Sequence, residues 1–445
     1  MSQKFSPNTA MAVVIANMIG TGVFTSLGFQ LADIQSGFVL MMLWVVGGLT
    51  ALCGAFTYAE LGAALPRSGG EYNFLSQIYH PGAGFVSGWI SATIGFAAPT
   101  ALAAITFGTY LASVFPSLSP TWLACGLVFF LTVVHTSSRR NSGALQRLFT
   151  SLKILLILAF CLLCWILVDQ PQSVNFLPAR GDGALLTSSA FAVSLIYVNY
   201  AYTGWNAATY LTGELDRPQQ NLSKVLILGT SVVLVCYVLL NFTFLYVAPM
   251  DAMVGKLEIG YITAKHVLGD SGAGVMGVLL AFLLVSTASA MILAGPRVLQ
   301  VIGQDFPAFR FLARTNKHDV PHIAITTQSL LSVVFILSAS FESILVFAGF
   351  TLGINTFITV LGTFVLRRTQ PELERPYRTP LYPLPPLIFL AFTGWTLGYI
   401  LLQRPEEGLL GLGIILSGTL FYLGTVWSGK RRARISGPGE GKRLS

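Results

Sequence analysis

Charged residues are scarce in this sequence of 445 residues. Only 26 Lys and Arg and 18 Asp and Glu are present, which together make 10% of the chain. Soluble globular proteins carry about 25% charged residues, so this chain cannot cover a water-soluble body of its size. With 54% hydrophobic residues and a mean hydropathy of +0.70, the composition excludes soluble enzymes, nucleic-acid binders and disordered proteins. It indicates a polytopic membrane protein.

Residues that hold metals or perform covalent chemistry are also few. The five histidines lie near the ends of apolar runs, and the motifs HExxH and GxSxG are absent from the sequence. All five cysteines fall inside apolar runs; Cys161 and Cys164 form a CxxC without His or acidic neighbours, which indicates buried thiols. The GxGxxG string at 272–277 follows no predicted strand, so it does not indicate a dinucleotide site. We expect no catalytic residues, no metal and no cofactor.

Long apolar runs dominate the rest of the chain. Crossing about 30 Å of hydrocarbon takes about 20 apolar residues in a helix, and continuous rather than alternating runs indicate helices instead of barrel strands. The chain does not open with the pattern of a cleaved signal peptide, so we expect the first run to be retained. The twelve predicted spans are 9–32, 38–62, 82–115, 121–136, 148–168, 185–212, 225–248, 273–301, 322–340, 343–366, 384–403 and 409–427.

The distribution of Lys and Arg predicts the orientation of these spans. With the N-terminus inside, twenty of these residues fall in cytoplasmic segments and four fall outside. Cytoplasmic loops carry an excess of Lys and Arg, so we expect a multi-pass protein of the cell membrane with both termini in the cytoplasm. The net charge of +8 is explained by these loops rather than by a nucleic-acid partner.

Two runs are poorly suited to continuous helix. In the first, Gly20 and Gly22 flank the β-branched Thr21 near the middle of the run. In the sixth, Gly204 lies among polar and aromatic residues in the sequence YAYTGWN at 200–206. Glycine costs about 1 kcal/mol relative to alanine inside a helix. Close helix packing explains one such glycine equally well, but two at corresponding places favour interrupted helices.

The two interruptions begin two successive groups of five spans. Because five is odd, the second group inserts with the opposite topology, and corresponding broken helices in inverted halves indicate the central site of a transporter. We expect an all-α polytopic membrane protein with twelve transmembrane helices, two inverted five-helix repeats with helices 1 and 6 broken, and two extra helices. The expected parts are a cytoplasmic N-terminus (1–8), the first repeat (9–168), the inverted repeat (185–366), helices 11 and 12 (384–427) and a basic cytoplasmic tail (428–445).

Broken helices expose main-chain groups that a ligand can satisfy. Each break leaves about four unpaired N–H groups at one new end and four C=O groups at the other, and both are costly in hydrocarbon. The positive end of the half-helix after Gly22 suits a carboxylate, and the exposed carbonyls suit an ammonium, so the site matches an α-amino acid. The candidate substrate-binding residues are Met18, Ile19, Gly20, Thr21, Gly22, Tyr200, Ala201, Tyr202, Thr203 and Gly204.

The spans also carry information about the side chain of the substrate. Asp and Glu are absent from the middle of every predicted span; the nearest, Glu60 and Glu214, fall toward cytoplasmic ends. A cationic substrate would favour a buried carboxylate, so a neutral amino acid is expected. Glycine and alanine are frequent in the third span, as at Gly95 and Ala101, which favours small to medium side chains.

Lys153 lies within the fifth span, where a charge at the bilayer centre costs about 2.5–3.5 kcal/mol. One interpretation is that its ammonium extends to the cytoplasmic surface near Arg147. The other is that it reaches the carbonyls of the broken first helix, in the place of a sodium ion. Arg297, after Gly295 and Pro296, is expected to anchor the cytoplasmic end of a span.

Several short motifs occur in a fixed order along the chain. They are GTGVF (20–24), YAELG (58–62), PRSGGEY (66–72), YAYTGWN (200–206) followed by Glu214, Pro218 and Asn221, GPRV (295–298), and RPYR (375–378) followed by Tyr382 and Pro383. With them the chain resembles the amino acid–polyamine–organocation (APC) superfamily over nearly its whole length. It is most similar to bacterial serine/threonine and alanine/serine/cysteine exchangers, relatives of the animal L-type amino acid transporters.

The resemblance implies roles for individual residues. Lys153 aligns with a lysine that contacts the unwound first helix in sodium-independent members, and Tyr237 aligns with a tyrosine linked to the same region; with Trp205 they are the expected coupling and gating residues. Thr203 stands where some close relatives have Asp. Animal L-type relatives pair with a glycoprotein subunit through a disulfide, but no cysteine lies in a predicted extracellular loop, so no covalent partner subunit is expected.

The sequence therefore predicts a sodium-independent, alternating-access transporter of small to medium neutral L-amino acids, working by exchange or facilitated diffusion. The alternative is a proton-coupled symporter that uses Glu60, Glu214 or a titrating Lys153. A membrane enzyme would need clustered catalytic groups, and a channel would need rings of like polar groups along a pore. Neither pattern is present in the sequence.

Overall fold

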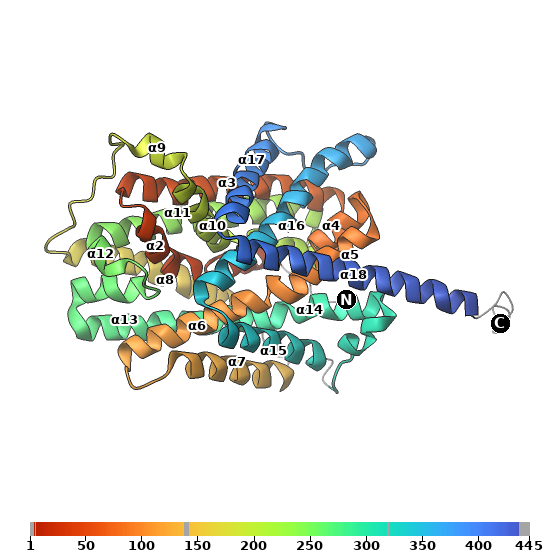
Figure 1. Ribbon diagram of the computed structural model, residues 1–445, viewed down its shortest axis with the longest axis horizontal. Helices are drawn as coiled ribbons and strands as arrows, with labels where there is room; N and C mark the ends of the chain where they lie inside the picture. Colours follow the sequence, from red (N-terminus) through yellow and green to blue (C-terminus); the bar gives the residue numbers. More distant parts are fainter. Residues whose placement is uncertain (1–3, 5, 138–141, 318–319, 436–445) are drawn as a thin grey trace.

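The computed structural model describes residues 1–445 apart from 1–3, 5, 138–141, 318–319 and 436–445. Every regular element in this described part is a helix (Figure 1). The longer elements are α1 (Pro7–Met18), α2 (Gly22–Asp33), α3 (Gly37–Ala64), α5 (Pro81–Ile90), α6 (Ala97–Val114), α7 (Pro120–Ser137), α8 (Ser142–Leu167), α10 (Ser189–Tyr202), α11 (Pro218–Val247), α13 (Ile259–Ala294), α14 (Pro296–Asp305), α15 (His322–Ser338), α16 (Phe341–Thr369), α17 (Leu384–Gln403) and α18 (Pro405–Ile435).

Short helices join or extend these elements. A π-helical turn, η1, separates α5 from α6 within the third span, and the 3-10 helix η2 continues the sixth span after α10. The short elements are α4 (Glu71–Ile78), η1 (Ser91–Gly95), α9 (Asp182–Leu186), η2 (Ala207–Glu214), α12 (Met250–Met253) and η3 (Pro307–Ala313).

The predicted spans agree with the helices of the structure. Ten segments of the described chain are long and apolar enough to cross a membrane. The remaining two predicted spans are α15, which is apolar but has only 17 residues, and the broken sixth span. The prediction for 273–301 began too late, because Lys265 and Asp270 interrupt the apolar run while α13 starts at Ile259 and bends at Gly269, where φ is 66°.

Serine caps define where several spans begin. Ser6, Ser36, Ser188 and Ser340 precede α1, α3, α10 and α16, and each side chain accepts a hydrogen bond from the main-chain N–H three residues later. Such a cap satisfies one of the N–H groups that a helix start leaves unpaired and stabilises it by about 1 kcal/mol.

The packing of the helices repeats after five spans. α2 packs against α10, α3 against α11, α6 against α13 and α7 against α15. Each pair joins a span to the span five positions later, which is the arrangement that two five-helix repeats of opposite orientation produce. α17 and α18 lie outside these pairs and pack against α3, α5 and α16 (Figure 1).

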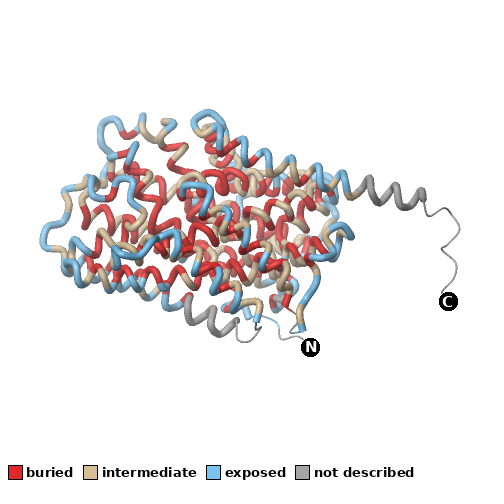
Figure 2. Tube along the Cα trace, turned by 60° about the horizontal axis from the view of Figure 1, so that its bottom comes forward, coloured by how far each residue is buried: buried red, intermediate tan, exposed pale blue. Residues whose placement is uncertain are grey.

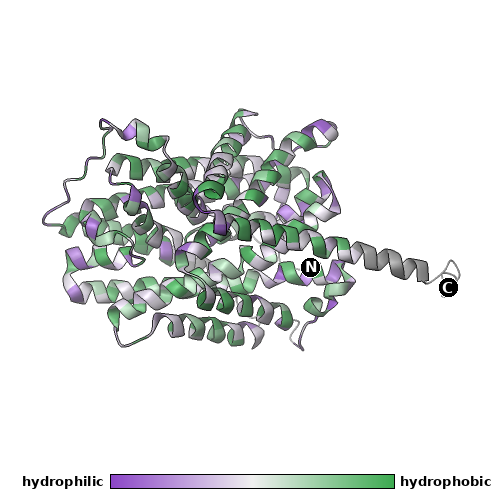
Figure 3. Ribbon diagram, viewed as in Figure 1, coloured by the Kyte–Doolittle hydropathy of each residue, from purple (hydrophilic) through white to green (hydrophobic). Residues whose placement is uncertain are grey.

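The outside of the bundle is apolar, and its interior holds polar residues. Large apolar side chains are exposed on its surface: Trp122 and Leu402 are each 75% exposed, and Phe129 is 71% exposed. Buried residues occupy the middle of the bundle (Figure 2), while green, hydrophobic ribbon covers the outer helices (Figure 3). A water-soluble protein rarely exposes such large apolar patches. The chain is a multi-pass membrane protein.

Candidate functional site

The first and sixth spans are both interrupted near their middle. α1 ends at Met18 and α2 begins at Gly22; between them the Gly20 N–H donates to the Met18 carbonyl at 2.8 Å instead of continuing the helix. α10 ends at Tyr202, and Gly204 has a φ of 99°, which side chains other than glycine rarely adopt. Both predicted interruptions are confirmed.

The two interruptions touch each other. A Cβ atom built on Gly22 would lie 2.6 Å from both Cα and Cβ of Ala201, and one built on Gly204 would lie 2.9 Å from the carbonyl atoms of Asn17. Only glycine fits at such separations. The end of α1 therefore rests on the break in the sixth span, and the start of α2 rests on the last turn of α10.

Tyr237 of α11 makes hydrogen bonds to both broken spans. Its hydroxyl oxygen lies 2.5 Å from the Met18 carbonyl oxygen and 3.0 Å from the Ala201 carbonyl oxygen. A hydroxyl has a single proton, so it donates to one of these carbonyls at a time. The ring is fully buried and packs edge-on against Trp44.

Lys153 of α8 points inward, to the break in the first span. Its Nζ donates to the Ile19 carbonyl at 3.1 Å and to the Thr287 hydroxyl of α13 at 2.8 Å. The residue is only 2% exposed. Of the two interpretations of Lys153 from the sequence, the structure agrees with the inward one.

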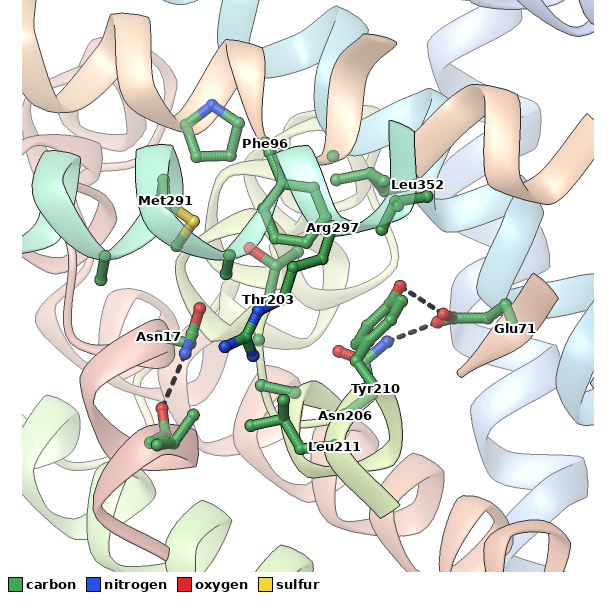
Figure 4. Close-up of a pocket in the computed structure, with 18 of the residues that line it drawn as sticks. Asn17, Glu71, Phe96, Thr203, Asn206, Tyr210, Leu211, Met291, Arg297 and Leu352 are labelled. Atoms are coloured by element: carbon green, nitrogen blue, oxygen red, sulfur yellow. Dashed lines mark hydrogen bonds between the residues drawn. The ribbon is translucent and has the colours of Figure 1, made fainter. Parts of the chain in front are cut away.

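A cavity of about 670 Å³ lies beside the breaks (Figure 4). Ile19, Tyr202, Lys153 and Tyr237 do not line it and stand behind the lining residues. The predicted site residues that do line it are Met18, Gly20, Thr21, Gly22, Tyr200, Ala201, Thr203, Gly204 and Trp205.

The main-chain groups around the breaks differ in how far they are already satisfied. Among the first N–H groups of α2, that of Phe24 already donates to the Thr21 carbonyl at 2.9 Å, and the N-cap, Thr21, makes no side-chain capping bond. The Met18 carbonyl accepts from the Gly20 N–H and from Tyr237. The Ile19 carbonyl accepts from Lys153, and the Ala201 carbonyl accepts from Tyr237. Because a carbonyl has two lone pairs, those of Ile19 and Ala201 retain room for a second donor, whereas that of Met18 has room only when Tyr237 donates to Ala201 instead.

Trp205 does not swing freely in the cavity. Its ring is 5% exposed and packs edge-on against Tyr58 at 4.6 Å and against Phe389 at 6.1 Å between ring centroids. The indole therefore fixes the sixth span to α3 and α17 just after the break.

The sequence analysis missed an acidic group at the cavity wall. Glu71 is the first residue of α4, is 1% exposed, and accepts hydrogen bonds from Tyr58 and, as Figure 4 shows, from Asn206 and Tyr210. Burial raises the pKa of this carboxyl group above its ordinary value. The sequence analysis examined acidic residues within the spans alone, and Glu71 lies outside them. The motif PRSGGEY was the signal that could have found Glu71.

Arg297 also differs from its expected place. It was expected to anchor the end of a span, but it lies at the start of α14 and its side chain points into the cavity (Figure 4). The reason is that α13 and α14 meet at Gly295 and Pro296 while the chain is still beside the cavity.

Glu60, by contrast, is held in an ion pair. Its carboxylate accepts from Arg367 at 2.8 and 2.7 Å and from the Thr379 N–H at 2.8 Å, and Arg375 lies 3.6 Å away. Glu60 is 1% exposed. The side chain of Glu214, at the end of η2, lies outside the described part of the structure.

The cavity has one open and one closed end. Its lining reaches Arg67, Gln304 and Asp305 at one end of the bundle. At the other end Tyr197 donates to Glu342 at 2.7 Å, Arg404 pairs with the same carboxylate, and Phe29 packs on the Tyr197 ring. These contacts close that end between α2, α10, α16 and the link from α17 to α18.

Comparison with known proteins agrees with this geometry. Residues 5–417 match the amino acid permease family. The b(0,+)-type amino acid transporter 1 of Homo sapiens is 27% identical over 423 residues, covering 93% of this chain and 86% of the relative. The large neutral amino acids transporter small subunit 2 of Mus musculus is 26% identical over 432 residues, covering 95% and 81%.

These matches confirm the resemblance to the APC superfamily that the sequence motifs indicated. They extend over nearly the whole chain, and the relatives are named as amino acid transporters. The chain belongs to the amino acid permease family and is a membrane transporter of amino acids, not an enzyme.

Proposed function

We propose that this protein carries small to medium neutral L-amino acids across the cell membrane by alternating access, without sodium, through exchange or facilitated diffusion. The observation that carries the proposal is the meeting of the two broken helices at the cavity wall. The start of α2 presents N–H groups to a substrate carboxylate, and the ends of α1 and α10 present carbonyls to its ammonium.

Lys153 supports transport without sodium. Its ammonium already occupies the space between the Ile19 carbonyl on the first span and Thr287 on α13. A sodium ion there would meet a fixed positive charge a few ångströms away. The Lys153 ammonium therefore supplies a positive charge at the first break without a bound sodium ion.

The lining favours a neutral side chain. Glu71 is the acidic residue at the cavity wall nearest the break in the sixth span, and three protein donors already occupy its carboxyl group. Arg297 adds a positive charge to the cavity. Beside the breaks a cationic substrate would lack an open acidic partner and would be repelled by that arginine, since the other acidic residue of the lining, Asp305, lies at the open end and accepts from Tyr72.

Proton symport is the second candidate. Both acceptors of the Lys153 ammonium are neutral oxygens, so loss of its proton would leave no unpaired negative charge there. Glu60 is less suited to carry a proton because Arg367 pairs with both of its oxygens. Lys153 is therefore the group to test first.

We further propose that both termini lie in the cytoplasm and that 9–168 and 185–366 are the two repeats. The excess of Lys and Arg in the assigned cytoplasmic segments supports this orientation. It places the open end of the cavity, with Arg67 and Asp305, on the cytoplasmic side. The structure then represents an inward-facing state closed to the outside.

We propose that any partner subunit is not attached by a disulfide. The name of one relative, a transporter small subunit, indicates that the relative assembles with another chain. The five cysteines of this protein lie in α3, α7, α8 and α11, inside membrane spans. A disulfide to another chain requires a thiol outside the hydrocarbon.

Purified protein in liposomes tests the proposal. Vesicles preloaded with one unlabelled amino acid are assayed for uptake of a panel of radiolabelled amino acids, in sodium or choline buffer, with and without a pH gradient. We expect uptake of neutral amino acids that preloading accelerates and that neither sodium nor the gradient changes. Uptake that follows the pH gradient would establish symport instead, and uptake that needs sodium would contradict the proposed role of Lys153.

A further inference from the structure

The segment after the break in the sixth span is clasped by the link between α3 and α4. The Gly70 N–H donates to the Thr209 carbonyl at 3.3 Å, and the Gly213 N–H donates to the Ser68 hydroxyl at 2.8 Å. A Cβ atom on Gly70, whose φ is 53°, would lie 2.9 Å from the Tyr210 ring. The link and η2 are therefore closely packed and hydrogen-bonded to each other.

The clasped segment needs this support. η2 (Ala207–Glu214) is a 3-10 helix of 8 residues, whereas such helices seldom exceed three or four residues because their hydrogen bonds are poorly aligned. An isolated 3-10 helix of this length would not keep its shape. Contacts from outside η2 must hold it in position.

Glu71 supplies the central contact. Its Oε1 accepts from Tyr58 of α3 at 3.1 Å and from the Asn206 amide, and its Oε2 accepts from the Tyr210 hydroxyl. Asn206 and Tyr210 are one turn apart, on either side of the start of η2. A single carboxyl group at the start of α4 thus holds both Asn206 and Tyr210 and, through Tyr58, connects them to α3.

The position of that turn determines the shape of the cavity. Asn206, Ala207, Tyr210 and Leu211 all line it, together with Thr203 and Gly204 of the break itself (Figure 4). Any displacement of the first turn of η2 moves this wall relative to the N–H groups of α2 across the cavity. Displacements of about 1 Å are enough to weaken a preorganised site.

We propose that Glu71 is a positioning residue for transport, which sets the substrate cavity by holding Asn206 and Tyr210 and does not itself contact the substrate. The inference rests on the proposed function only in taking this cavity as the substrate site. It assigns the effect to hydrogen bonding rather than to charge, because Glu71 accepts hydrogen bonds from the neutral donors Tyr58, Asn206 and Tyr210.

The chain offers variants that separate these effects. E71Q keeps one acceptor oxygen for Tyr58 and Asn206 and places an amide near the Tyr210 hydroxyl, which can accept a hydrogen bond as well as donate one. E71A removes every acceptor and leaves the buried donors unsatisfied. E372A is the matched control, since Glu372 is an exposed carboxylate in the link between α16 and α17.

The experiment measures uptake of radiolabelled L-alanine and L-leucine by each variant in liposomes, as KM and as maximal rate per folded molecule. Thermal unfolding of the purified proteins reports the folded fraction. We expect E71A to raise KM at least tenfold while E71Q stays within threefold of the wild type and E372A is unchanged. A KM of E71A equal to that of the wild type, or a fall in maximal rate that only follows the folded fraction, would overturn the inference.

A second variant tests the inference if E71A does not fold. Y210F removes one donor to the carboxyl group and keeps the ring, and we expect it to raise KM three- to tenfold; an unchanged KM would overturn the inference in the same way. The proposed function fails separately: a wild-type protein that takes up none of the neutral amino acids contradicts that function, whereas normal wild-type uptake with an unaltered E71A contradicts the positioning role alone.

Discussion

The Lys153 ammonium lies 3.1 Å from the Ile19 carbonyl oxygen, at the point where the first span is broken. A lysine buried in a membrane span is costly, and this one is held by two oxygens from two different spans. The bond joins α8 to the break and, through Thr287, to α13. Because Thr287 lines the cavity, this hydrogen bond also connects α8 to the cavity wall.

Replacing Lys153 by Met should abolish most transport. The change removes hydrogen bonds from a charged donor, each contributing about 1.5–3 kcal/mol, and leaves the Ile19 carbonyl without its partner. We expect uptake of L-alanine to fall by about tenfold or more. Thr287→Val, which removes only one of the two acceptors, should give an intermediate loss. Full activity of the Lys153→Met protein would contradict the importance of this contact.

Gly22→Ala should impair transport through packing. The added methyl group would lie 2.6 Å from Ala201, and overpacking of this kind costs about 1–3 kcal/mol. We expect α2 and α10 to separate and uptake to decrease at least fivefold. Gly413→Ala in α18, where no atom lies within 4 Å of the new methyl group, serves as the control. Equal uptake by the two variants would show that the contact is dispensable.

Arg404→Ala should make the closed end of the cavity easier to open. Arg404 pairs with Glu342, which also accepts from Tyr197. Because both partners of the ion pair are partly exposed, the pair stabilises the closed end by at most about 1 kcal/mol. We expect up to about fivefold faster maleimide labelling of a Ser26→Cys protein, because Ser26 is buried behind Tyr197. Lys265→Ala, which breaks the exposed pair with Asp270, should leave the labelling rate unchanged.

The buried Glu71 should make stability depend on pH. Burial raises its pKa in the folded protein, so the folded state binds the proton more tightly than the unfolded state. Its contribution to stability is then fully present below the ordinary pKa of about 4.3 and is lost as pH rises through the folded-state value. The difference in Tm between wild type and E71Q should therefore shift against the wild type from pH 4.5 to pH 8. A constant difference across this range would contradict the raised pKa.

Local sequence was enough to locate the spans and the two breaks. Apolar runs specify membrane helices by length alone, and the glycines at Gly20, Gly22 and Gly204 mark the interruptions. The reason for Gly22 was incomplete, however. The sequence explained it by the low helix preference of glycine, whereas the structure shows in addition that a side chain there would collide with Ala201.

Contacts between distant residues could not be read in this way. Two directions were open for Lys153, and the sequence cannot specify which one a long, flexible side chain takes. Glu60 and Arg367 are 307 residues apart, so their pairing depends on the packing of α3 against the end of α16. Glu71 was overlooked because a polar residue in a link between spans is ordinarily solvated, and only the folded link brings it to the cavity wall.

Tyr237 has one hydrogen to offer to two carbonyls, Met18 of the first span and Ala201 of the sixth. When it donates to one, the other oxygen has an open lone pair, which in the proposed function accepts from the substrate ammonium. An arriving amino acid would thus complete a hydrogen-bond pattern that the empty protein can only half complete. Under the proposed function, binding of the amino acid would therefore change the hydrogen bonds that hold the two broken helices together.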